Sequence, residues 1–87
     1  MEIIFKKTAL DDLNIWKKTG NTSAQKKISN LLAEISVTPY FGTGQPEQLK
    51  HDLAGYWSRR INSEHRIIYK ISDDNEITIY SLRGHYE

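Results

Sequence analysis

The chain has 87 residues, which is enough for one domain with one hydrophobic core. It contains no cysteine, so a disulfide framework and a cysteine-based zinc site are excluded. The N-terminal residues lack the basic and apolar segments of a signal peptide, and no run of about 18 apolar residues could span a membrane. We therefore expect residues 1–87 to form a single cytoplasmic domain.

The first elements predicted in chain order are a strand and a helix. Residues 1–5 are mostly apolar and β-branched, which is typical of a strand. Thr8 and Asp11 have the spacing of a capping box, so we expect a helix to begin there. Apolar residues at three-residue spacing predict its buried stripe: Leu10, Leu13 and Trp16.

A second helix should follow after a short turn. Gly20 can adopt the positive φ of a helix C-terminus, and the apolar periodicity resumes from about Ser23. Pro39 disfavours helical geometry at the residue before it and ends the segment. The predicted apolar face of this helix consists of Ile28, Leu31, Leu32 and Ile35. The two helices should form an α-hairpin.

The C-terminal half indicates an antiparallel meander. Residues 40–48 contain glycine and proline and are predicted to be irregular. Beyond Gly55 the apolar period becomes two, which predicts three strands separated by short polar turns, at 56–61, 65–71 and 76–82. The order of elements therefore predicts an α+β fold. The helices should cover one face of the sheet and leave the other face free to be polar.

The arginines are clustered along the chain, although the net charge of the whole chain is only +1, and residues 50–70 contain five Lys or Arg residues against two acids. All four arginines lie in the C-terminal third: Arg59, Arg60, Arg66 and Arg83. Guanidinium groups match phosphate oxygens in a bidentate way, so the cluster suits a phosphate ligand. A solvated sheet face with no ligand would have the same composition.

Three residues have the chemistry needed to cut RNA. The ribose 2′-OH is itself the nucleophile, so cleavage needs a base, an acid for the leaving 5′-oxygen and a cation for the charged transition state. Glu47, His85 and Arg66 could take these roles in that order. A free carboxylate has a pKa of about 4.3 and histidine about 6.5, so the residues alone leave open which of the two is the base.

Each candidate also has an ordinary structural interpretation. Glu47 could be a solvated loop residue, Arg66 could pair with Glu64 or Glu47, and residues 85–86 could be a frayed chain end.

The histidines do not have a zinc-site spacing, so we expect no metal or other cofactor. Other polar and aromatic residues are expected to be structural: Trp57 and Tyr69 in the core, and His51 and His65 in hydrogen bonds to the backbone.

The combination of these residues closely resembles a known family. The segment is Pro46-Glu47-x-Leu49-Lys50-His51-x-Leu53-x-Gly55-x-Trp57-Ser58-Arg59-Arg60-Ile61-x-x-Glu64-His65-Arg66, and His85-Tyr86 follows near the C-terminus. Its long, rigid spacing resembles the YoeB/Txe toxins of bacterial toxin–antitoxin systems, within the RelE-like messenger-RNA interferases. The resemblance extends over nearly the whole chain.

The resemblance implies a RelE-like fold and a metal-independent endoribonuclease that cuts messenger RNA in the ribosomal A site. Carried over by position, Glu47 matches the general base, Arg66 the phosphate-stabilising arginine, His85 the general acid and Tyr86 a tyrosine that arranges the substrate. The resemblance also implies RNA or phosphate binding by three further basic residues: Lys50, Arg59 and Arg60.

The implied partners are a YefM/Axe-like antitoxin, the ribosome, messenger RNA and a second copy of the chain, with DNA bound only through the antitoxin. One residue departs from the family pattern, because Glu87 follows the tyrosine that ends the relatives. We expect Glu87 to project into solvent, so that its deletion leaves cleavage within about tenfold.

Two other functions fit such a fold. RelE-like folds also include toxins that bind gyrase without cutting RNA, and a small RNA-binding module would use the same arginines to hold phosphates. Glu47, Arg66 and the pair His85-Tyr86 favour the nuclease.

Overall fold

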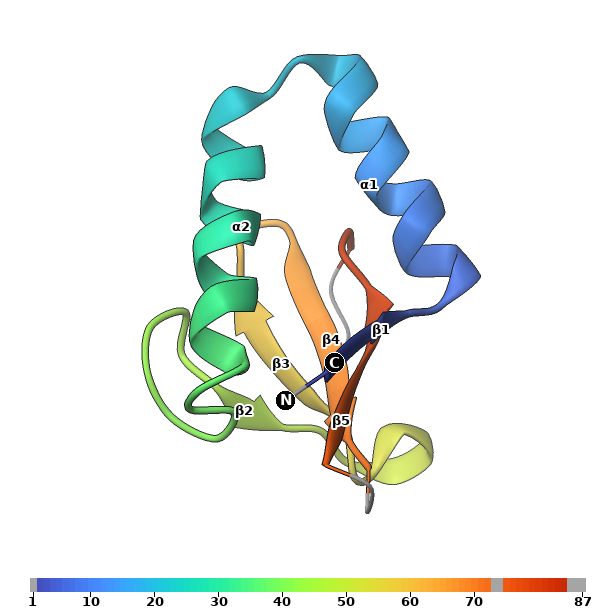
Figure 1. The fold of residues 1–87 in the computed structure, drawn as a ribbon, viewed down its shortest axis with the longest axis vertical. Coiled ribbons are helices and arrows are strands. Elements are labelled where there is room, and N and C mark those ends of the chain that lie inside the picture. The colour runs from blue at the N-terminus through green and yellow to red at the C-terminus, as the bar shows by residue number, and fades with distance from the viewer. Residues whose placement is uncertain (1, 73–74, 85–87) are drawn as a thin grey trace.

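The structure, a computed structural model, describes residues 2–72 and 75–84. Figure 1 shows two helices joined by a tight turn and lying against a twisted sheet. The elements in order are β1 (Glu2–Phe5), α1 (Lys7–Thr19), α2 (Thr22–Ile35), β2 (Glu47–Gln48), a 3₁₀ helix (His51–Leu53), β3 (Trp57–Arg60), β4 (Arg66–Ile71) and β5 (Glu76–Ser81). None of the described helices has the length and hydropathy to cross a bilayer.

The strands form one sheet with the order β1-β5-β4-β3-β2. The meander of β3, β4 and β5 is antiparallel, as the sequence predicts, and β1 pairs with β5 in parallel. The α+β fold is thus confirmed. β2 was predicted as part of an irregular segment, but its two residues pair with β3 and extend the sheet by one edge strand.

The helix ends are partly as predicted. Gly20 adopts a φ of 70° and ends α1, which is a conformation that glycine tolerates best. The capping box is wrong: Lys6 is the N-cap of α1 and makes no side-chain cap, so Thr8 lies inside the first turn. α2 begins one residue before Ser23, and the Asn21 side chain caps it by accepting a hydrogen bond from the Ala24 N–H.

The core lies between the helical hairpin and one face of the sheet. Leu10 is 48% exposed, so the predicted stripe on α1 is wrong at this residue, and Ala9 is buried in its place. The predicted stripe on α2 is confirmed, with Leu32 at its partly buried edge. The buried cluster joins both helices to the sheet and comprises Ala9, Trp16, Ala24, Ile28, Leu31, Ile35, Ile61, Ile67, Tyr69, Ile77, Ile79 and Leu82.

Candidate active site

Strand pairing places the candidate residues on two different faces of the sheet. Residues directly opposite each other on neighbouring strands share a face, and successive residues alternate between faces. Arg59 pairs with Ile67, which belongs to the core, so its side chain is on the helix-covered face. Arg60 pairs with Arg66 on the opposite face, which we call the outer face.

Glu47 lies on the outer face because it pairs with Ser58, the residue between two positions that face the helices. It occupies the edge strand β2, and its side chain is exposed. Arg60 is two residues beyond Ser58 on the same face, so Glu47 and Arg60 are diagonal neighbours. Such neighbours are about 7–8 Å apart. A phosphate group fits between side chains at this spacing.

The arginine pair on the outer face is electrostatically unusual. Like charges directly opposite each other in a sheet are destabilising. Neither Arg60 nor Arg66 forms an ion pair within the described part of the chain, and this includes Glu47 and Glu64, the partners considered for Arg66. The pair therefore has the charge and geometry to bind an anion.

The Arg66 guanidinium is held in place from one side. Its Nη1 donates to the main-chain oxygens of the turn between β3 and β4, at 3.0 Å to Asn62, 3.2 Å to His65 and 3.5 Å to Ser63. Among the described residues, Nη2 and Nε have no hydrogen-bond acceptor. These N–H groups are left to donate to a ligand.

Other residues on the outer face were missed by the sequence analysis. The rings of Tyr56 and Tyr80 meet edge to face at 5.6 Å, and the Lys70 ammonium lies 5.4 Å from the Tyr56 ring. This group gives the outer face an aromatic and basic flank that suits a nucleobase. Lys70 and Tyr56 are each next to a residue that was expected in the core, so the period-two alternation of the strands could have placed them on the outer face. Lys50 is exposed just beyond β2, and its side chain makes no hydrogen bond or ion pair with the other described residues.

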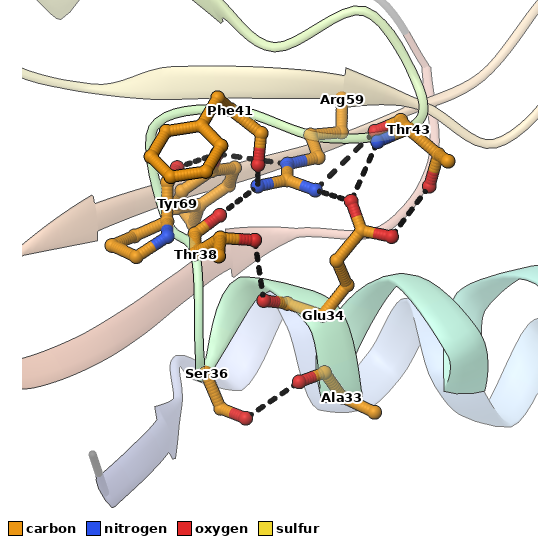
Figure 2. Close-up of polar contacts among 9 residues, drawn as sticks. Ala33, Glu34, Ser36, Thr38, Phe41, Thr43, Arg59 and Tyr69 are labelled. Atoms are coloured by element: carbon orange, nitrogen blue, oxygen red, sulfur yellow. Dashed lines mark hydrogen bonds and ion pairs between the residues drawn. The ribbon is translucent and has the colours of Figure 1, made fainter.

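Arg59 is not at the RNA-binding surface that we expected. Its side chain is fully buried, and its five N–H donors all bond within the chain (Figure 2). The acceptors are Glu34 Oε1 at 2.5 Å, the Tyr69 hydroxyl and the main-chain oxygens of Thr38, Phe41 and Thr43. Arg59 thus ties the loop after α2 to the sheet, and its guanidinium is not available to bind RNA.

The neighbours of Arg59 have shifted pKa values. Hydrogen bonds from the Thr43 hydroxyl and then the Thr43 backbone N–H hold the pKa of the Glu34 carboxyl below its usual value, and Arg59 adds to this effect. Burial raises the pKa of Tyr69, so its hydroxyl stays protonated and donates to the Pro39 oxygen. Tyr69 is a core residue, and Trp57 packs at the core's edge, as expected.

The proposed acid His85 and its neighbour Tyr86 lie outside the described residues, as does Glu87. The described chain leads up to them through Gly84, which is hydrogen-bonded to His65 and to Arg66, the first residue of β4. His65 Nδ1 accepts a hydrogen bond from the Gly84 N–H at 2.9 Å, which confirms the backbone role expected for His65. The described residues contain no cluster of three or more potential metal ligands.

Comparison with known families decides the identity of the chain. Residues 5–86 match the model of a family described as the YoeB-like toxin of bacterial type II toxin–antitoxin systems. The chain belongs to this YoeB toxin family. The family match ends at Tyr86 and leaves Glu87 beyond it.

Named relatives agree with the family assignment. Toxin YoeB of Escherichia coli strain K12 is 42% identical over 86 residues, which are 99% of this chain and 100% of the relative. Toxin YoeB of Synechocystis is 42% identical over 87 residues, covering 100% of this chain and 99% of the relative. The likeness therefore extends across the whole YoeB toxin.

Solved structures of YoeB toxins have the same fold. A YoeB/ParE toxin from Agrobacterium tumefaciens superposes with a TM-score of 0.93 at 38% identity, covering 99% of this chain and 100% of that one. The toxin in a YoeB–YefM complex from Staphylococcus aureus superposes with a TM-score of 0.86 at 41% identity, covering 99% and 98%. A YoeB dimer from the same organism matches equally well, with a TM-score of 0.86.

Proposed function

We propose that this YoeB toxin is a metal-independent endoribonuclease that cuts messenger RNA in the ribosomal A site. The observation that carries the proposal is the arrangement on the outer face. There a carboxylate, Glu47, lies diagonally from an arginine pair, Arg60 and Arg66, that no described acidic side chain neutralises. A phosphodiester and the neighbouring ribose hydroxyl supply the missing negative charge and the proton that Glu47 would take.

The reaction is an attack of the ribose on its own phosphate. Glu47 takes the proton of the 2′-OH, and the 2′-oxygen bonds to phosphorus while the bond to the 5′-oxygen breaks. His85 gives its proton to the departing 5′-oxygen, so the products are a 2′,3′-cyclic phosphate and a 5′-hydroxyl. Arg66 stabilises the extra negative charge that the phosphorus centre carries in between.

The other basic and aromatic residues bind and orient the RNA. Arg60 is exposed next to Arg66 and would hold a phosphate oxygen, and Lys50 would contact the backbone beyond β2. Tyr86 would arrange the substrate beside the acid. With a net charge of only +1, the chain has little general attraction for free RNA, so the ribosome would supply much of the positioning.

The relatives support a set of partners. Because Staphylococcus aureus YoeB is found in a YoeB–YefM complex and as a YoeB dimer, we expect this chain to dimerise and to be held inactive by a YefM/Axe-like antitoxin. DNA contacts would then belong to the antitoxin. The toxin would act as a single domain in the cytoplasm, where ribosomes are.

Mapping transcript ends after a brief induction in growing cells tests the proposal. The native chain should produce new ends clustered near start codons, and Glu47→Gln should produce none at the same protein level. DNA damage signalling without new transcript ends would instead support a gyrase-binding toxin. Growth arrest with neither effect would indicate RNA binding alone.

A further inference from the structure

The segment Leu82–Gly84 is tied down from two sides. It follows β5 and leads directly to His85, and Figure 1 shows it running between α1 and β4. We propose that Asp12, Trp16 and His65 are positioning residues, which fix this segment so that the general acid reaches the leaving 5′-oxygen. This inference rests on the proposed nuclease function and adds residues to its site.

Helix α1 holds both main-chain groups of Leu82. Asp12 Oδ2 accepts a hydrogen bond from the Leu82 N–H at 2.9 Å, and Trp16 Nε1 donates to the Leu82 oxygen at 2.8 Å. Asp12 and Trp16 are four residues apart and therefore lie on the same face of the helix. Trp16 is only 5% exposed, so its hydrogen bond is shielded from water.

His65 and the residue after it, Arg66 at the start of β4, hold both main-chain groups of Gly84 in the same way. His65 Nδ1 accepts from the Gly84 N–H at 2.9 Å, and the Arg66 N–H donates to the Gly84 oxygen at 2.8 Å. Gly84 has a φ of 78°, where other residues are strained. The rings of Trp16 and His65 pack nearly perpendicular to each other with their centroids 4.9 Å apart, and this contact joins the two sets of hydrogen bonds.

Four hydrogen bonds thus hold the main-chain groups of Leu82 and Gly84 within a segment of three residues. Arg66, the first residue of β4, supplies one of these hydrogen bonds through its main-chain N–H, and its guanidinium binds the phosphate in the proposed reaction. The segment before the acid is thereby tied to the residue that binds the reacting group. A displacement of about 1 Å in such a geometry costs about 10²-fold in rate.

Two substitutions of His65 separate positioning from packing. The Asn side-chain oxygen in His65→Asn lies near the place of Nδ1 and can accept the Gly84 N–H, whereas His65→Leu cannot. Both variants lose the imidazole ring and its contact with Trp16, so they are matched in packing. Amide exchange at Gly84 should rise in His65→Leu and stay near the native rate in His65→Asn.

The decisive readout is single-turnover cleavage of two ribosome-bound messenger RNAs. One has the natural leaving 5′-oxygen, and the other has sulfur there, which leaves without needing a proton from an acid. His65→Leu should slow cleavage of the oxygen substrate at least about tenfold and leave the sulfur substrate within about twofold. His65→Asn should restore most of the lost rate.

Equal losses on both substrates, or no loss on either, would overturn the positioning role while the nuclease function stands. If the native chain cuts neither substrate, the proposed function itself is wrong and the inference falls with it. Asp12→Ala and Asp12→Asn form a second matched pair, since Asn can still accept the Leu82 N–H and Ala cannot. Should His65→Leu fail to fold, the same pattern is expected between these two.

Discussion

Arg59 and Arg60 are neighbours in β3, yet their surroundings are opposite. Arg59 is fully buried, and five acceptors within the chain bind its N–H groups. Arg60 is exposed, faces a second arginine across the strand pair and forms no ion pair with any described residue. A cation satisfied within the chain serves the fold, whereas a cation pair without an anion is available to a ligand. Residue type alone does not distinguish the two.

Each face of the sheet also has its own carboxylate. Glu34 binds Arg59 and Thr43 on the helix-covered side, so its charge is used within the protein. The Glu47 side chain on the outer face makes no hydrogen bond or ion pair with the described residues, so it is free to take a proton from a substrate. The chain thus offers matched pairs of residues whose roles we can separate by experiment.

The largest expected effect is a loss of cleavage rate when Arg66 on the outer face is replaced. Arg66→Ala should slow single-turnover cleavage by about 10²–10³-fold, because it removes charge where negative charge develops on the phosphate. Arg66→Lys keeps the charge but not the fork of donors, so it should recover only part of the rate. The unfolding midpoint in urea should change little. Cleavage at the native rate by Arg66→Ala would contradict the role given to the outer face.

Removal of the buried arginine should affect stability instead. Arg59→Met leaves Glu34 without its cation and three loop oxygens without donors, and it should lower the free energy of unfolding by about 3 kcal/mol. Arg60→Met is the matched control on the outer face and should stay within about 0.5 kcal/mol of the native chain. Urea unfolding followed by fluorescence measures both. Equal free energies of unfolding for the two variants would contradict the claim that Arg59 stabilises the fold and Arg60 does not.

A smaller effect is expected from pH. The pKa of Glu34 is lowered in the folded state, so its contacts stabilise the protein above the unfolded pKa of about 4.3. This stabilisation should be lost as the pH falls through the lower, folded pKa. Urea unfolding between pH 6 and pH 3 should therefore show declining stability, and Glu34→Gln should make the decline shallower. The same slope in both proteins would show that Glu34 is not the group responsible.

Most of the fold could be predicted from the sequence. Periodicity identified both helices and all three meander strands, since these elements bury clear apolar faces. β2 could not be predicted, because Glu47 and Gln48 have no apolar alternation and form a strand only by pairing with β3. Thr8 failed as a cap because the chain turns into α1 directly at Lys6, where no side chain makes the cap.

The site was predicted by residue type more than by place. Glu47, Arg60 and Arg66 were chosen for their chemistry, and the structure puts them on one face. Arg59 was chosen for the same reason and is buried. Arg59 and Trp57 are two residues apart in a predicted strand and therefore share a face. Because Trp57 was expected in the core, this spacing could have indicated that Arg59 is buried. Its acceptors in the loop after α2 are tertiary contacts that no local pattern contains.

The central claim is that charges on the outer face serve cleavage, whereas charges on the helix-covered face serve stability. The most direct test of it compares Glu47→Gln with Glu34→Gln in one experiment. Both replace a carboxylate by an amide of the same shape, and both are assayed for single-turnover cleavage of ribosome-bound messenger RNA and for urea unfolding. Glu47→Gln should lose at least about 10²-fold in cleavage with unchanged stability. Glu34→Gln should be less stable and yet cut at the native rate per folded molecule. Native cleavage by Glu47→Gln, or loss of cleavage by fully folded Glu34→Gln, would contradict the account.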